Sequence, residues 1–355
     1  MFLARTSLII LLPCTVLVLL SVLIGQVQYP SVISFASSSG GGDYHLQLLD
    51  IFQNRTYQLN DNNVFCCPVW SPDGQKVIFI LSYQQGSNLR KRLYLMNANG
   101  SHARPLTAAS APDPLFADWS PDGEHIVYVT MPLGQDTEIA VMDWQTGVTQ
   151  QLTSNAQDDD SPQWSPDGRF IVYRSRSESG TWDIYRMNPH GEDVQPLTDS
   201  QGNDLYPRIS PDSRRIAFVS DRTANRDLFV MSADGTDLRQ LTSTPALEMI
   251  PLWSPDGSQI LFQSQRQGAV YGGINVIDAD GRNLLQLIDS TVPTHPADTF
   301  WSPDGSHIVF VSESETGSPN IFVMDADGSH VRQITNNLHP VTYPAWQPRP
   351  YRAGN

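Results

Sequence analysis

The chain has 355 residues, with 22 Lys or Arg against 37 Asp or Glu, and therefore a net charge of −15 at pH 7. This acidity argues against a nucleic-acid partner, because phosphate binding needs a basic surface. Apolar residues make up 40% of the chain, which supplies a packed core and excludes wholesale disorder. Three cysteines are too few for a disulfide scaffold, while 24 Gly and 26 Pro provide turn chemistry for many short strands.

An apolar run, residues 8–24, lies near the N-terminus and is preceded by Arg5. Its length falls between a signal-peptide core and a membrane-spanning helix. Because Arg5 is the only basic residue before Arg55, the positive-inside rule keeps the N-terminus cytoplasmic and places the rest outside. We expect residues 1–30 to be a signal anchor formed by an N-terminal apolar helix. A cleaved signal peptide, giving a secreted protein, is the alternative. Residues 31–43, rich in Ser and Gly, are predicted to be a flexible spacer.

A sequence repeat predicts the architecture of the remaining chain. Trp-Ser-Pro-Asp-Gly occurs five times, and Ile209 opens a degenerate sixth copy. The serines stand at positions 71, 120, 165, 210, 254 and 302, so the copies are 44 to 49 residues apart. After each copy come apolar segments separated by polar turns, and most units end in Leu-Thr or Ile-Thr. No helical period is present. Four short strands in a unit of about 45 residues predict the blade of a β-propeller.

The Pro-Asp-Gly step has a local physical reason. Pro fixes φ at the first corner, Asp can accept hydrogen bonds from the backbone, and Gly takes the positive φ that reverses the chain. A calcium loop would need further aspartates and a distal Glu at set spacings, which are missing here. We therefore interpret these aspartates as turn residues and the repeated Trp as a blade-packing residue.

Two partial units flank the six complete ones. Residues 46–60 repeat the outer strand pair of a unit, and residues 343–347 repeat the innermost strand. We expect the two ends to meet in one composite blade, which closes the ring and removes open sheet edges. The prediction is an all-β fold: a propeller of seven four-stranded blades over residues 44–350, with residues 351–355 as a tail. On this prediction the composite blade is one strand short.

The motif Trp-Ser-Pro-Asp-Gly, followed by segments such as Ile321–Gly328 and Arg239–Thr242, resembles the β-propeller repeats of the periplasmic TolB family. Similar propellers precede the catalytic domain in prolyl-oligopeptidase-type peptidases. The resemblance covers residues 44–350 and implies a propeller fold. The α/β domain that precedes the TolB propeller is not found in this sequence, nor is the Gly-x-Ser-x-Gly nucleophile motif of an α/β-hydrolase. We therefore expect a propeller displayed alone from a membrane.

Three consecutive units carry an acidic residue six positions before the motif serine, in the segment that leads into the Trp. These residues are Asp159, Asp204 and Glu248. Asp158 and Asp160 add to this acidic arc, and Asp118 and Asp298 lie in nearby segments. Equivalent positions of a ring face a common axis, so we expect the carboxylates to converge and to favour a cation such as calcium, or a cationic group of a partner. A solvated acidic rim is the alternative, and no cofactor is required.

His295 and His339 lie in corresponding segments of adjacent units. Lone propellers that resemble this family include oligogalacturonate lyases, which hold a metal with channel histidines. Two histidines fall short of such a cluster, and an acidic rim would repel a polyanionic substrate.

Two functions follow from these observations. The first is a non-catalytic module that recruits a protein or peptide partner at the cell envelope through its loop face. The alternative is a metal-dependent lyase or hydrolase that acts on a carbohydrate or small ligand in the channel. The two differ in whether at least three His, Gln or carboxylate groups converge within metal-bonding distance at one end of the channel.

Overall fold

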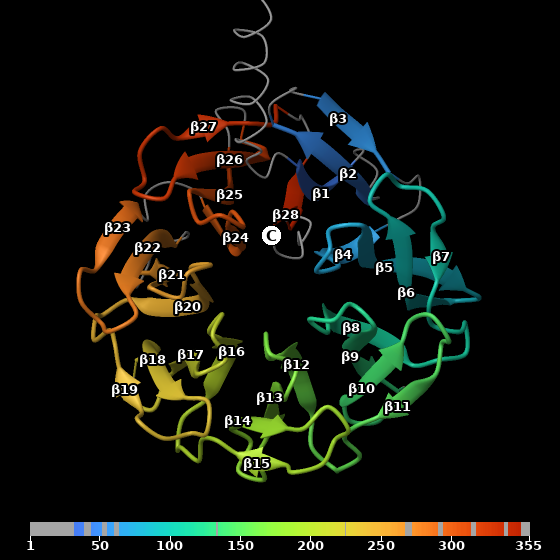
Figure 1. Cartoon of the computed structure of the whole chain (residues 1–355), viewed down its shortest axis with the longest axis horizontal. Helices are drawn as coiled ribbons and strands as arrows, with labels where there is room; N and C mark the ends of the chain where they lie inside the picture. Colours follow the sequence, from blue (N-terminus) through green and yellow to red (C-terminus); the bar gives the residue numbers. More distant parts are fainter. Residues whose placement is uncertain are drawn as a thin grey trace, which may run out of the picture.

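The computed structural model describes residues 32–38, 44–51, 55–59, 64–132, 134–223, 225–266, 272–289, 294–313, 317–336 and 340–348, with only the backbone described at 64–66 and 294–297. Every regular element in these ranges is a β-strand. The strands form seven four-stranded antiparallel sheets around a central axis (Figure 1). The predicted all-β, seven-bladed propeller is therefore confirmed. Among the described residues no helix is long and apolar enough to cross a membrane, and residues 8–24 lie outside them.

Six blades are built from strands consecutive in the sequence, innermost strand first. Blade 1 comprises β4 (Val64–Trp70), β5 (Lys76–Gln85), β6 (Asn88–Asn97) and β7 (Arg104–Pro105). Blade 2 comprises β8 (Asp113–Trp119), β9 (His125–Met131), β10 (Glu138–Asp143) and β11 (Thr149–Gln151). Blade 3 comprises β12 (Asp159–Trp164), β13 (Ile171–Arg176), β14 (Trp182–Met187) and β15 (Gln195–Pro196). Blade 4 comprises β16 (Asp204–Ile209), β17 (Arg215–Ser220), β18 (Asp227–Ser232) and β19 (Arg239–Gln240). Blade 5 comprises β20 (Leu247–Trp253), β21 (Gln259–Gln265), β22 (Gly273–Asp278) and β23 (Leu285–Ile288). Blade 6 comprises β24 (Thr294–Trp301), β25 (His307–Glu313), β26 (Pro319–Asp325) and β27 (Arg332–Gln333).

Blade 7 is composite, as predicted. Its innermost strand is β28 (Val341–Trp346), and β1 (Val32–Ser38), β2 (Tyr44–Asp50) and β3 (Arg55–Gln58) follow outward. Ile33 lies opposite Trp346, and Ser37 lies opposite Val341. The two ends of the described chain thus pair in one sheet, which confirms the predicted closure of the ring.

The prediction of a flexible spacer over residues 31–43 is wrong for Val32–Ser38, which forms β1. Ile33 and Phe35 are fully buried, and so is Ser34. The Ser34 hydroxyl accepts a hydrogen bond from Trp70 Nε1 at 3.0 Å and donates to the Ala345 carbonyl at 3.3 Å. Ser-rich composition concealed a strand whose serines are buried and hydrogen-bonded. Blade 7 therefore has four strands, and the propeller begins at Val32 instead of residue 44.

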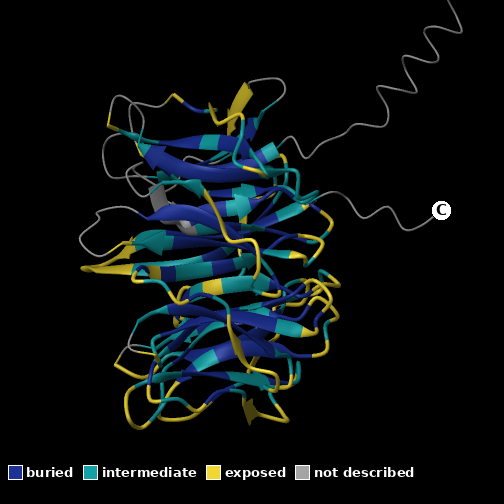
Figure 2. Cartoon of the chain, turned by 90° about the vertical axis from the view of Figure 1, so that its left-hand side faces the viewer, coloured by how far each residue is buried: buried dark blue, intermediate teal, exposed yellow. Residues whose placement is uncertain are grey.

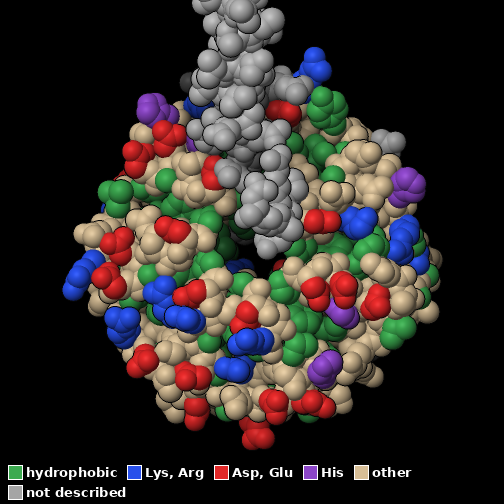
Figure 3. Space-filling view, viewed as in Figure 1, with side chains coloured by type: hydrophobic (Ala, Val, Ile, Leu, Met, Phe, Trp, Pro, Cys, Tyr) green, Lys and Arg blue, Asp and Glu red, His purple; other side chains and the backbone are tan. Residues whose placement is uncertain are grey.

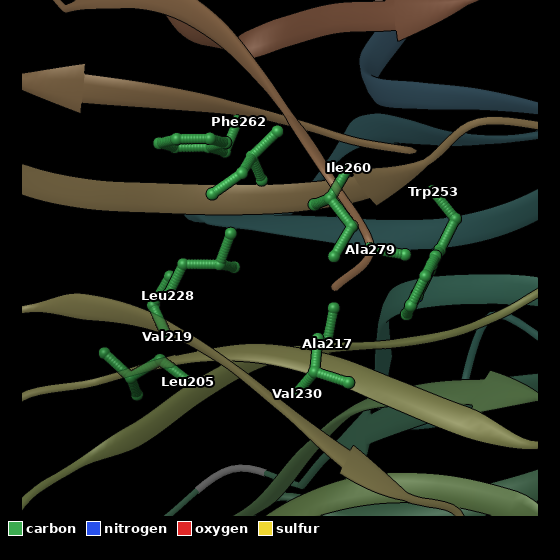
Figure 4. Close-up of a cluster of buried hydrophobic side chains, with 10 residues drawn as sticks. Leu205, Ala217, Val219, Leu228, Val230, Trp253, Ile260, Phe262 and Ala279 are labelled. Carbon is green, nitrogen blue, oxygen red and sulfur yellow. The ribbon is translucent and has the colours of Figure 1, made fainter. Parts of the chain in front are cut away.

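The core lies between the blades. There are seven clusters of buried apolar side chains, and each joins residues of two neighbouring blades. Figure 4 shows the cluster between blades 4 and 5, where Leu228 faces Phe262 across the junction. Figure 2 shows the buried residues in the interior of the disc and the exposed residues at its rim and loops. This arrangement explains why the middle strands are apolar on both faces, since each blade has a neighbour on each side.

The Ser-Pro-Asp-Gly turns confirm the predicted turn chemistry. In the first copy the Ser71 hydroxyl donates to Asp73 Oδ1 at 2.5 Å, and the Gln75 amide donates to the same oxygen at 3.0 Å. Gly74 has φ of +67°. A Cβ atom there would come within 2.7 Å of the Pro348 carbonyl oxygen, so only Gly fits both the conformation and the space.

Removing β28 should open the ring. A chain that ends before Tyr343 loses the Trp346 side chain, which is 7% exposed, and unpairs Ile33. Each buried apolar side chain lost or uncovered costs about 1.5–3 kcal/mol, and the inner edge of β1 becomes unpaired. We expect a large fall in the melting temperature measured by calorimetry.

A chain that ends at Pro348, with β28 intact, is the matched control for that truncation. Equal melting temperatures of the two truncated chains would contradict closure by β28.

Candidate functional site

We call the face where each blade passes to the next the linker face, and the face with the Ser-Pro-Asp-Gly turns the turn face. The innermost strands run from the linker face to the turn face and surround the axis (Figure 1). Figure 3 shows an opening at the centre of one face of the disc.

The three residues of the predicted acidic arc occupy equivalent positions, as expected, but they are not loop residues. Asp159 and Asp204 begin β12 and β16, and Glu248 is the second residue of β20. Asp159 and Asp204 are fully buried, and Glu248 is 1% exposed. The arc is therefore not a solvated rim.

Each arc carboxylate is held by neighbours of its own. Asp159 accepts a hydrogen bond from Asn155 Nδ2 at 2.7 Å. Both oxygens of Asp204 lie 2.9 Å from Arg222 Nη2. Glu248 accepts hydrogen bonds from the hydroxyls of Thr244 (2.9 Å) and Ser264.

The structure does not bring the three arc residues together. Within the described ranges, the one trio of metal-ligating side chains with ligand atoms within 4.8 Å of one another is Asp122, Glu124 and His125. That trio lies in the exposed turn of blade 2, away from the arc. A single calcium ion bound directly by Asp159, Asp204 and Glu248 together does not fit this arrangement.

The additional acidic residues are ion-paired or bridge blades. Asp160 pairs with Arg174 of the adjacent strand, and Asp158 lies 3.8 Å from Arg176 Nη1. Asp118 accepts the Trp164 amide of the next blade at 3.1 Å, and Asp298 accepts the Tyr343 amide at 2.8 Å. Burial raises the pKa of Asp118 and of Asp298 to about 6 each.

The side chain of His295 and the whole of His339 lie outside the described residues.

Each arc carboxylate has a second carboxylate beside it that the sequence analysis missed. Glu138, Asp183 and Asp227 lie near the start of the third strand of the preceding blade, each 21 residues before its arc partner. Repulsion between the members of each pair adds to the effect of burial, which raises the pKa of Glu138 and Asp183. Burial, with a smaller contribution from Asp227, raises the pKa of Glu248 to about 7. The recurring spacing of 21 residues was the available sequence signal.

The junctions between blades differ in how they compensate the negative charge of these carboxyl pairs. Between blades 3 and 4, Arg222 supplies a positive charge to Asp204. Between blades 2 and 3, Asp159 Oδ1 is buried without a hydrogen-bond partner of good geometry, and burial raises the pKa of Asp159. The arc thus consists of buried carboxyl pairs that contribute to the junctions between blades.

A backbone bulge beside the channel is the second feature that the sequence analysis missed. In six blades the residue three positions before the motif Trp, or before Ile209, has positive φ without being Gly. These residues are Cys67, Phe116, Ser161, Tyr206, Ile250 and Tyr343. The pairing between the first two strands of each sheet shifts register around this position. A positive φ is uncommon for such residues, above all for β-branched Ile250 with φ of 46°.

We call these six residues the bulge ring. Each strained residue costs on the order of 1–3 kcal/mol and persists only where the surrounding fold enforces it. The innermost strands surround the axis (Figure 1), so the bulge ring lies beside the channel. Phe116 is 51% exposed although it sits in the middle of an inner strand. No member of the ring is acidic, basic or a histidine.

Comparison with known proteins places this geometry in a family context. The family model described as "TolB beta propeller domain" matches residues 117–204 and 195–284. The Tol-Pal system protein TolB of Alcanivorax borkumensis is 33% identical over 84 residues, which are 23% of this chain and 18% of that protein. The chain thus matches less than a fifth of that relative's length. Residues 117–284 are TolB-type propeller repeats, which confirms the resemblance.

Solved structures agree on the fold. TolB from Acinetobacter baumannii superimposes with a TM-score of 0.61, at 19% identity, over 92% of this chain and 87% of that one. An oligogalacturonate lyase in complex with manganese gives 0.63 at 16% identity, over 85% and 84%. A prolyl endopeptidase gives 0.67 at 13%, over 89% and 49%. A similar propeller fold therefore occurs in TolB, in a lyase and in a peptidase, and the fold alone does not decide between binding and catalysis.

Loss of the Arg222 guanidinium should strongly destabilise the propeller. The substitution Arg222→Met leaves Asp204 buried without its ion-pair partner, which costs about 3–5 kcal/mol. The double variant Asp204→Asn with Arg222→Met should recover much of that loss, because position 204 then no longer carries an unpaired buried charge. Urea denaturation measures both.

Arg169→Met is the control for the Arg222 variants, since this side chain is 84% exposed and its pair with Asp167 is long at 3.8 Å. We expect a change within about 0.5 kcal/mol. Equal effects of the two single substitutions would contradict the role of the buried pair.

Stability should fall between pH 5 and pH 8 because of Glu248. Its pKa is about 7 in the folded protein and about 4.3 in an unfolded chain, so the folded state binds the proton more tightly. The resulting stabilisation is complete below the unfolded pKa and is lost as pH rises through 7. The expected loss is on the order of 3 kcal/mol. Glu248→Gln should flatten this part of the pH profile in denaturation experiments.

Asp256→Asn is the contrasting variant for that profile. Hydrogen bonds from Ser254 and Ser258 lower the pKa of Asp256, so it is ionised in both states across this range. The substitution should reduce stability by a similar amount at pH 5 and pH 8. An unchanged slope in Glu248→Gln would show that Glu248 does not titrate here.

Proposed function

We propose that this TolB-type propeller is a non-catalytic binding module that recruits a protein or peptide partner at the cell envelope. In this proposal residues 8–24 anchor the chain in the membrane and the propeller is extracytoplasmic. An extended segment of the partner enters the channel from the linker face and contacts the bulge ring.

The bulge ring is the observation that carries the proposal. Bulges re-aim side chains and interrupt pairing, and they are enriched beside functional sites. Here the same strained conformation recurs beside the channel in six blades. The ring contains a thiol, three aromatic side chains, a hydroxyl and an aliphatic side chain. Such a set favours binding through apolar contact and hydrogen bonds, and it offers no acid–base pair.

A projecting hairpin extends the linker face over blade 1. β5 and β6 are each 10 residues long, and their last four residue pairs, from Ser82 and Lys91 to Gln85 and Asn88, lie beyond the pairing with β4. Arg90 fixes the hairpin by an ion pair of 2.7 Å with Asp113 and a hydrogen bond of 2.8 Å to the Ala111 carbonyl. Leu89, near the tip, is 57% exposed. The hairpin thus offers a partner a fixed apolar contact on the linker face.

The pairing of blade 7 supports the proposed orientation. Ile33 lies opposite Trp346, at the turn-face end of β28, so the chain enters the propeller from the turn face. If residues 8–24 anchor the chain, the linker face is the one turned away from the membrane. A partner elsewhere in the envelope then meets the linker face first.

A metal-dependent lyase or hydrolase is the competing proposal, favoured by the likeness to the manganese-bound oligogalacturonate lyase. It would rest on His295 and His339. Cleavage of an oligogalacturonide in the presence of manganese, lost in His295→Ala, would support it in place of the binding role.

Photo-cross-linking of the full chain in its native membrane tests the binding role. A photoreactive residue at position 116 should form a discrete protein adduct, because Phe116 lies in the proposed contact zone. The same residue at position 148 is the control, since Val148 is 68% exposed but directly precedes β11, the outermost strand of blade 2. Phe116→Asp should abolish recruitment of that adduct's protein in co-purification. Adducts of equal yield at both positions, or at neither, would contradict the proposal.

A further inference from the structure

A second ring of side chains lines the channel, one residue before the motif Trp or Ile209 in each innermost strand. We call these residues the inner ring: Val69, Asp118, Gln163, Arg208, Leu252, Phe300 and Ala345. Each of them is partly exposed, whereas the Trp or Ile that follows it is buried. Because no strand lies on the axial side of an innermost strand (Figure 1), these partly exposed positions face the channel.

The inner ring is polar on one side and apolar on the other. Blades 2, 3 and 4 contribute Asp118, Gln163 and Arg208, and the other blades contribute apolar side chains. The inner ring lies two residues closer to the turn face than the bulge ring, which is about 7 Å along an extended strand. A segment that enters from the linker face and passes the bulge ring therefore reaches the inner ring next.

Asp118 and Gln163 each reach across a junction to the backbone of the next blade. Asp118 Oδ2 accepts the Trp164 amide at 3.1 Å, and Gln163 Oε1 accepts the Ile209 amide at 3.0 Å. These two bonds place the three polar side chains in a row along the channel wall. Arg208 cannot continue the series, because a guanidinium has no acceptor.

The Arg208 guanidinium keeps donors that the fold does not use. Its Nη1 donates to the Pro207 carbonyl at 3.0 Å, and it forms no ion pair with a described residue. Burial lowers the pKa of Arg208, and the charge of Asp118 offsets this effect only in part. A partly desolvated positive charge without an ion-pair partner is stabilised by an anion that enters the channel.

The neighbours of Arg208 select the class of anion. An arginine binds a carboxylate through two parallel hydrogen bonds, and the Gln163 amide nitrogen, which donates to no described residue, can add a third. Asp118 lies in the same row and disfavours an anion with several charges, such as phosphate. The apolar side of the inner ring fits the remainder of a peptide chain. A single carboxylate on a peptide thus matches the whole ring.

We propose that Arg208 and Gln163 bind a carboxylate of the partner's segment inside the channel. This carboxylate belongs either to the C-terminus of the partner or to one of its Asp or Glu side chains. The inference rests on the proposed binding of an extended segment in the channel, and it adds the chemical group that the segment must carry.

Three peptide probes test the proposal on the full-length protein: acetyl-tetraalanine with a free C-terminal carboxylate, its C-terminal amide, and an amidated peptide of the same length with one glutamate. Binding is followed by calorimetry and by the NMR signals of the arginine Nε–H groups. We expect saturable binding of at least one carboxylate probe, with a shift of the signal that Arg208→Gln removes. The amide without a carboxylate should not bind. The probe that binds identifies the source of the carboxylate.

Two substitutions of the site should weaken binding. Arg208→Gln should do so by about ten- to a hundredfold, as expected for lost hydrogen bonds to a charged group. Gln163→Glu keeps an acceptor for the Ile209 amide but places a competing carboxylate beside Arg208, so it should weaken binding by about tenfold or more. Asp118→Asn removes a negative charge and should strengthen binding by about twofold or more. Arg282→Gln is the matched control, since this side chain is 82% exposed in a turn of blade 5.

Three results would overturn the proposal: no binding of either carboxylate probe, equal binding of the amide, or binding that both Arg208→Gln and Gln163→Glu leave unchanged. If Arg208→Gln lowers the melting temperature, Gln163→Glu decides the outcome. Binding of galacturonate but of neither peptide would also overturn it. The cross-link at position 116 is scored separately. A discrete adduct together with no peptide binding would refute the carboxylate site alone, whereas peptide binding without an adduct would refute the proposed recruitment alone.

Discussion

The contact between neighbouring blades is the constraint on which the rest of the structure depends. Its recurring element is the motif Trp, whose indole N–H donates in four blades to a carbonyl of the preceding blade's innermost strand. The indole nitrogens of Trp164 and Trp346 are buried without such a bond. Trp119 donates to the Val69 carbonyl (3.2 Å), Trp253 to that of Arg208 (2.9 Å) and Trp301 to that of Leu252 (3.3 Å). Trp70 donates to Ala345 (3.2 Å), across the closing junction. In each of these four cases the acceptor directly precedes the residue at the motif Trp position of its own blade, so the bond sets the same offset between the blades at these four junctions. Apolar burial at the junctions then supplies most of the stabilisation, because it scales with area and needs no direction.

The sequence predicted the features that this constraint repeats. Six motif copies at near-equal spacing led to the blades, the turns and the closure by β28. The prediction failed where the amino-acid composition of a segment did not indicate its place in the fold. Ser34 and Ser37 in β1 read as spacer residues, but both are buried and the strand completes blade 7. No local propensity reveals such a strand, since its pairing partner, β28, lies about 300 residues away in the sequence.

The candidate site was likewise predictable from the sequence only in part. Equivalence of Asp159, Asp204 and Glu248 was predictable from spacing, and so was the presence of partners 21 residues earlier. Their environment was not. Ring symmetry suggested convergence on the axis, whereas the strand starts place each carboxylate in a junction between blades, where Asn155, Arg222 or Ser264 binds it. The bulge ring had no chemical signature, because its members share a backbone conformation and not a side-chain type.

In a repeat protein, positions that depart from the repeat carry information that the repeat itself cannot. Trp and Ser-Pro-Asp-Gly recur because every blade needs the same junction and turn. The aromatic pair of the middle strands is not such a constant: four blades have it, whereas Ala140, Asn275 and Gln47 stand at the third-strand position in the other three. The hairpin of β5 and β6 is longer than its counterparts in the other blades. Ring closure does not need this added length. Binding, as proposed above, is the explanation that gives the longer hairpin a purpose.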